Sequence, residues 1–245
     1  MVITTTAVGF SLSGLGLAFC GFWFFKAFQK IGGLRSGNQI GILLSTFFLG
    51  LALQHFILAI GGFAFITNTE ALYAVLVIDA IVLAIVTALG IYLFFYILLP
   101  NFSSKWAAIV TMFYGLFVTT LIIFTHLRPF LTTSQAIDWN MSRLTSLSLY
   151  YLLLLNIGAP FLIFVKNLFY ATTRDVKLIS IIIASATFAG LINVSIGFLS
   201  FLDSSADLRG FIFDRILGII GILFIIGFFI IPLWYGWVSK KSYGK

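Results

Sequence analysis

The sequence predicts an all-α membrane protein: a bundle of seven transmembrane helices with its N-terminus outside the cell and its C-terminus in the cytoplasm. Three observations predict it: the composition, the number of long apolar segments and the distribution of basic residues. Of the 245 residues, 61% are hydrophobic and only 9% are charged. Soluble domains have about 45–50% apolar and about 25% charged residues. Lipid can solvate the outer faces of such apolar helices, whereas water cannot.

Seven segments are long and apolar enough to cross the hydrocarbon layer, which takes about 20 residues of helix. They form a single membrane domain over residues 1–245, with the longest connection running from Leu127 to Arg143. That connection is polar, and we expect it to form a short interfacial helix or a lid. The expected helices cover residues 7–28, 40–66, 71–99, 106–125, 144–170, 177–201 and 211–238.

The basic residues predict the orientation. If the loops alternate between two sides, ten basic residues fall on one side and four on the other. The side richer in Lys and Arg is expected to face the cytoplasm, which requires an odd number of crossings when the N-terminus is outside. The ten are Lys26, Lys30, Arg35, Lys105, Lys166, Arg174, Lys177, Lys240, Lys241 and Lys245, and the four are Arg128, Arg143, Arg209 and Arg215.

Polar residues inside the predicted helices gather toward the outer side. Small residues recur at helical spacing on several of these helices and predict packing seams. His55, Asn193 and Asp214 lie on these seams. The candidate ligand-binding residues are His55, Asp79, Asn156, Asn193, Asp214 and Arg215.

Asp79 is the most informative of them. It lies roughly 12 Å below the outer end of its helix, at 1.5 Å of rise per residue. A charged carboxylate at such a depth costs about 2.5–3.5 kcal/mol and usually faces a cavity or a partner. Three interpretations stay open: the polar anchor of a ligand pocket, part of an ion or proton path, or a protonated group that bonds to a neighbouring helix. The expected partners are His55, Asn193, Arg215 or water.

Several classes of function are disfavoured. His55 and His126 lie at different depths, so we expect no haem, metal or other cofactor. No nucleophile, metalloprotease or phosphate-loop motif is found, so we expect no enzyme. The single cysteine, Cys20, excludes an intrachain disulfide. Residues 211–238 contain no lysine for a retinal Schiff base. The net charge of +7 lies in short loops, which favours anionic lipid over nucleic acid.

The leading hypothesis is a receptor or sensor module in the plasma membrane. It would bind a small amphipathic molecule or lipid in the outer half of the bundle and pass a signal to a cytoplasmic or membrane partner protein. One alternative is a small proton- or cation-linked transporter or channel that uses Asp79. The other is a non-catalytic subunit of a larger membrane complex.

Overall fold

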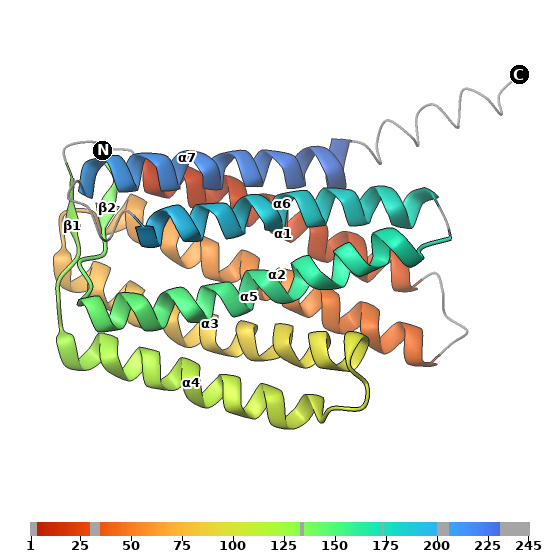
Figure 1. Cartoon of the computed structure of the whole chain (residues 1–245). Coiled ribbons are helices and arrows are strands. Elements are labelled where there is room, and N and C mark those ends of the chain that lie inside the picture. Colours follow the sequence, from red (N-terminus) through yellow and green to blue (C-terminus); the bar gives the residue numbers. More distant parts are fainter. Residues whose placement is uncertain (1–3, 30–34, 133–134, 173, 200–205, 231–245) are drawn as a thin grey trace, which may run out of the picture.

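The computed structural model describes residues 4–29, 35–132, 135–172, 174–199 and 206–230. Helices account for nearly all of these residues (Figure 1). They are α1 (Thr5–Gln29), α2 (Arg35–Ala64), α3 (Thr69–Leu98), α4 (Ser104–Thr125), α5 (Arg143–Tyr170), α6 (Arg174–Leu199) and α7 (Ala206–Ile225), which continues into a π-helical turn (Ile226–Ile230). The expected helix ends agree with these bounds to within five residues, except that residues 200–201 of the sixth and 231–238 of the seventh lie outside the described residues.

Six helices, α1 to α6, are long and apolar enough to cross a membrane among the residues that the structure describes. The molecule is thus an integral, multi-pass membrane protein. The described part of α7 is shorter, at 20 residues, and contains Asp207, Arg209, Asp214 and Arg215. The fold confirms an all-helical membrane domain with six such spans, whereas the seventh span stays a prediction.

The outer surface of the bundle is apolar, as lipid contact requires. Large hydrophobic side chains project outward from each of the six helices, with Phe113 on α4 69% exposed and Phe124 83% exposed. Exposing so large an apolar surface to water would be unfavourable, whereas lipid acyl chains solvate it. Lipid is therefore the natural environment of this surface.

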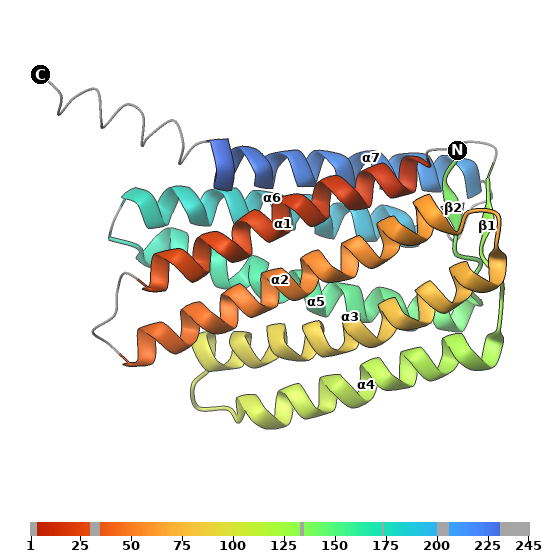
Figure 2. The same ribbon diagram turned by 180° about the vertical axis from the view of Figure 1, so that it is seen from behind.

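The helices run alternately up and down, and α3 lies at the centre. It packs against α2, α4 and α5, and a larger share of its apolar segment is buried than of the apolar segment of α4, 61% against 28%. Helix α4 lies at the edge of the bundle in both views (Figures 1 and 2). On the opposite edge α1 packs along α2 and α7.

The two ends of the bundle differ in charge. One end, here called the hairpin end, holds strands β1 (Phe130–Leu131) and β2 (Ile137–Asp138) and the starts of α1, α5 and α7 (Figure 1). The other, here called the lysine end, holds Lys26, Lys105, Lys166 and Lys177, which lie at or near the ends of their helices. The bundle therefore keeps apart the two groups of charges that the sequence assigns to opposite sides.

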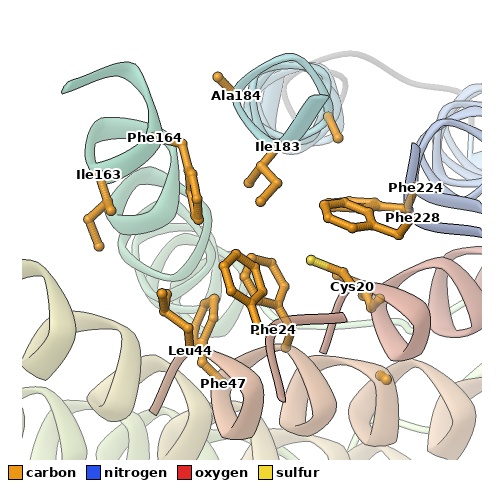
Figure 3. Close-up of a cluster of buried hydrophobic side chains, with 14 of the residues drawn as sticks. Cys20, Phe24, Leu44, Phe47, Ile163, Phe164, Ile183, Ala184, Phe224 and Phe228 are labelled. Atoms are coloured by element: carbon orange, nitrogen blue, oxygen red, sulfur yellow. The ribbon is translucent and has the colours of Figure 1, made fainter. Parts of the chain in front are cut away.

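Aromatic side chains fill the half of the bundle toward the lysine end, here called the packed half. The rings of Phe24 and Phe48 stack with centroids 5.5 Å apart and planes 3° apart. Phe164 lies 5.9 Å from Phe24, and Phe224 lies 6.3 Å from Phe48. The rings come from α1, α2, α5 and α7, and aliphatic side chains of α3 and α6 complete the cluster (Figure 3). Dense contacts of this kind stabilise helix association in lipid, where no hydrophobic drive exists.

Glycines bring α1 and α7 into backbone contact. A Cβ atom on Gly221 would lie 2.3 Å from the backbone carbon of Leu12, and one on Gly16 would lie 2.6 Å from the carbonyl oxygen of Gly221. Any side chain at these positions would push the helices apart. Gly221 lies on the small-residue seam predicted for the seventh helix. Gly14 and Gly21, on the seam predicted for the first helix, face α2 instead, against Phe56 and Leu49.

The connection between α4 and α5 forms a hairpin rather than the interfacial helix expected as one possibility. β1 pairs antiparallel with β2, Phe130 facing Asp138 and Leu131 facing Ile137. Its described residues contain no helix. Three residues with left-handed backbone angles bend it: His126 (φ 43°), Gln135 (φ 62°) and Asn140 (φ 45°). Polar loop residues are the non-glycine types that best tolerate this conformation.

Candidate functional site

A cavity of about 190 Å³ lies inside the bundle, between the packed half and the hairpin. Helices α1, α2, α3, α5, α6 and α7 line it, and α4 contributes no residue. At its lysine end it is bounded by Leu17, Phe48 and Phe224, which separate it from the rest of the aromatic cluster. Trp139 and Met141, just after β2, line it from the hairpin connection. The connection therefore contributes to the cavity wall, as a lid would.

Most of the cavity wall is aliphatic or aromatic, with a small polar group. Its polar members are Gln54, His55, Asp79, Asn156, Thr187 and Asn193. Four of the six residues that the sequence singles out, His55, Asp79, Asn156 and Asn193, thus meet in one cavity. They come from α2, α3, α5 and α6, so the fold brings together positions far apart in the chain.

Asp79 is buried on α3, with only 6% of its surface exposed. The side chain of Gln54 on α2 hydrogen-bonds to its carboxyl group. The Oδ1 atom of Asp79 has no hydrogen-bond partner among the described residues. A buried oxygen without a hydrogen-bond donor costs folding free energy. This atom could therefore accept a hydrogen bond from a bound molecule.

His55 faces the cavity in a defined orientation. Its Nδ1 lies 2.8 Å from the carbonyl oxygen of Leu51. A carbonyl can only accept, so Nδ1 carries a proton, and Nε2 is the acceptor in the neutral ring. The ring packs edge-on against Phe10, with centroids 5.4 Å apart.

Asn156 is 2% exposed on α5, and its Oδ1 has no hydrogen-bond partner among the described residues. Pro160 follows one turn later and also lines the cavity. Proline has no N–H, so it cannot donate the helical hydrogen bond to the backbone carbonyl of Asn156. This stretch of α5 therefore has two acceptor oxygens without a donor from the described residues: the side-chain Oδ1 and the backbone carbonyl of Asn156.

Asp214 and Arg215 do not line the cavity. The Asp214 Oδ2 atom accepts hydrogen bonds from the hydroxyls of Thr5 (2.7 Å) and Thr6 (2.8 Å) at the start of α1. The backbone N–H of Ile137 in β2 donates to the Thr6 hydroxyl at 2.9 Å. These contacts, here called the Asp214 tie, join α7, α1 and the hairpin. Asp214 therefore has protein partners, and the interpretation of it as a ligand-binding residue is not supported by its position.

Sequence reasoning missed two parts of the site. Gln54 precedes His55 but does not lie on a small-residue seam, which is the feature that distinguished His55. Trp139, in the connection between α4 and α5, also lines the cavity but is not among the predicted site residues. The threonines that bind Asp214 carried no distinguishing signal. Within the described ranges, His, Cys, Asp and Glu residues form no group of three that could hold a metal ion.

Comparison with known proteins identifies no relative of the chain. No protein family, curated protein or solved structure matches the chain. Its function must be argued from the cavity and its surroundings.

Proposed function

We propose that this protein is a receptor or sensor of the plasma membrane that binds a small amphipathic molecule in the cavity. One observation carries the proposal: the cavity is lined mainly by hydrocarbon and has a few polar side chains from four different helices. Small-molecule sites have this character, since apolar walls supply affinity and a few polar groups fix orientation. A bound molecule would touch six helices at once. It could therefore bias their arrangement, which a cytoplasmic or membrane partner would read.

A thermal-stability screen of small metabolites and lipids on the purified protein tests this proposal. A ligand of the cavity stabilises the wild-type protein, and the stabilisation grows with the logarithm of the ligand concentration above the Kd. The variant Ala186→Leu extends a buried cavity-lining residue into the space and should abolish this stabilisation. Ser185→Leu is the matched control, because Ser185 is exposed on the outer side of the same helix, and it should keep the response. Equal responses in both variants would place the ligand elsewhere.

We further propose that α7 crosses the membrane as a seventh span, with the hairpin end outside and the lysine end in the cytoplasm. The separation of basic residues supports this orientation, and the close packing of α7 along α1 supports its insertion. The charges of α7 lie in its first half, where Asp214 is satisfied by Thr5 and Thr6.

Cysteine labelling of intact cells tests the orientation. Gln135 in the hairpin and Asn101 in the α3–α4 turn are both exposed and lie at opposite ends, while native Cys20 is fully buried. A membrane-impermeant maleimide should label Gln135→Cys and leave Asn101→Cys unlabelled until the cells are opened. The reverse labelling pattern would show that the bundle has the opposite orientation in the membrane. A tag at the C-terminus should become accessible only in opened cells, as an odd number of spans requires.

Transport is a second candidate, favoured by the buried carboxyl group of Asp79 in the cavity. Intramembrane carboxylates often mark ion or proton paths. In reconstituted vesicles, transport should appear as ion-dependent flux that Asp79→Asn abolishes. An absence of flux from the wild-type protein together with ligand-induced stabilisation would favour the receptor.

A further inference from the structure

The polar groups of the cavity have an imbalance of donors and acceptors. The atoms left without a hydrogen bond among the described residues include Oδ1 of Asp79 and Oδ1 of Asn156. The amide oxygen is an acceptor, and so is the oxygen of Asp79 when the carboxyl group is ionised. The Nε2 atom of His55 is a third acceptor in the neutral ring, because Nδ1 donates to Leu51. Since Pro160 has no N–H, the backbone carbonyl of Asn156 lacks its usual helical donor as well. A molecule that pairs these acceptor atoms must therefore donate hydrogen bonds.

The charge in the cavity is also unbalanced. Asp79 is its only acidic lining residue, and no lysine or arginine lines it among the described residues. Gln54 offers a hydrogen bond but no charge. An ionised carboxylate inside a bundle is stabilised by a partner of opposite charge. His55 is the one other titratable side chain in the described wall of the cavity, and its ring is uncharged when Nε2 serves as an acceptor. A positive charge would then have to come from the bound molecule.

The size and lining of the cavity decide between a metal cation and an organic one. The volume is about 190 Å³, and a dry protein cavity of about 150 Å³ is known to hold a benzene molecule. A bare sodium or potassium ion would occupy a small part of it and leave the apolar wall unfilled. The aromatic side chains of Phe10, Phe48 and Trp139 line the same space and can pack against hydrocarbon or a cation. An organic cation with an apolar body fits both the charge and the space.

We propose that the cavity recognises a small amine: an ammonium group that binds Asp79 and Asn156, attached to an apolar body about the size of a benzene ring with a short chain. This inference rests on the proposed function and specifies the chemical class of the ligand. The ammonium donates up to three hydrogen bonds, which matches the acceptors contributed by α3 and α5. Its apolar body extends along the aliphatic and aromatic wall.

The test compares 2-phenylethylamine with 2-phenylethanol, which has a similar shape but no charge. Binding to the purified protein in lipid nanodiscs is measured by calorimetry at neutral pH. The amine should bind at least ten times more tightly than the alcohol. A preference for the alcohol, equal affinities, or no binding of either compound would overturn the inference. Because this comparison uses the wild-type protein, it does not depend on whether a variant folds.

Two variants locate the interaction. Asp79→Asn keeps the size of the side chain and removes its charge, so it should weaken amine binding at least tenfold and change alcohol binding by less than about twofold. Asp138→Asn removes a carboxyl group from the hairpin, outside the cavity lining, and should change neither affinity. Unchanged amine binding in Asp79→Asn would overturn the inference.

Failure of this inference can be told from failure of the proposed function. If neutral compounds stabilise the protein and Ala186→Leu abolishes that response, the cavity binds ligands but does not select amines. If sodium or potassium chloride alone stabilises the wild-type protein and not Asp79→Asn, while the amine does not compete, the site takes an inorganic cation and the inference is overturned.

Discussion

The packed half of the bundle and the cavity half beyond it, toward the hairpin, solve the problem of holding helices together in different ways. In the packed half, aromatic rings from α1, α2, α5 and α7, together with aliphatic side chains of α3 and α6, fill the space between the backbones. In the cavity half the same helices leave about 190 Å³ empty, and hydrogen bonds such as those of the Asp214 tie connect the elements around it. In lipid both kinds of contact stabilise association. The difference indicates that the packed half maintains the fold while the cavity half is available for binding.

The largest expected effect concerns the loss of an aromatic ring. Phe24→Ala removes a ring that contacts Phe48 and Phe164, and it should lower the free energy of unfolding by about 3 kcal/mol or more. Phe10→Ala removes an equally buried ring that already borders the cavity. It has fewer contacts to lose there, so its cost should be smaller by about 1 kcal/mol. Reversible unfolding in mixed micelles measures both. Equal costs would remove the distinction between the halves.

A matched pair of Gly→Ala substitutions should give opposite signs. A Cβ on Gly90 would lie 2.7 Å from the buried ring of Phe47, so Gly90→Ala should cost about 1–3 kcal/mol. A Cβ on Gly190 would lie 3.3 Å from Ile157, and that side chain can shift into the cavity that it lines. Gly190→Ala should then be neutral or stabilising by up to about 1 kcal/mol, because alanine favours the helix. Thermal unfolding of both variants tests this, and destabilisation by Gly190→Ala would argue against free space there.

The smallest effect is expected at the Asp214 tie. Asp214→Ala removes the acceptor of two hydrogen bonds from Thr5 and Thr6 and should cost about 1 kcal/mol. The loss should be local, because these bonds join the start of α1 to the hairpin and not to the packed half. Hydrogen exchange of the Ile137 amide, which bonds to Thr6, should accelerate, while amides beside Phe164 should not change. Faster exchange in both places would show that the halves are coupled.

The hydropathy of the sequence was sufficient to predict most of the helices. The ends of α1 to α6 lie within a few residues of those expected, because the length of an apolar run is set by the thickness of the bilayer. The hairpin was not foreseen, since its two-residue strands are too short to leave a periodic pattern. The seventh span is the weakest part of the prediction, because Asp214 and Arg215 interrupt the apolar pattern where α7 packs against α1.

The site was predictable only where depth alone identified it. Asp79 and Asn156 stand out as polar residues in apolar runs, and both line the cavity. Their neighbours depend on the rotation of each helix about its axis, which the sequence does not determine. Gln54 was therefore overlooked although it is the side chain that hydrogen-bonds to Asp79. Asp214 was grouped with the site because it is polar and near the same end, but a carboxylate with two hydroxyl donors needs no ligand.

Cys20 has a practical consequence. It is the only cysteine of the chain, it is fully buried, and Figure 3 shows it within the cluster that includes Phe24, Phe224 and Phe228. A thiol reagent can reach it only when this part of the bundle opens, so the rate of its modification reports the frequency of that opening. The native chain thus carries a built-in kinetic probe of its packed half, which needs no engineered label and responds to any ligand that slows the opening.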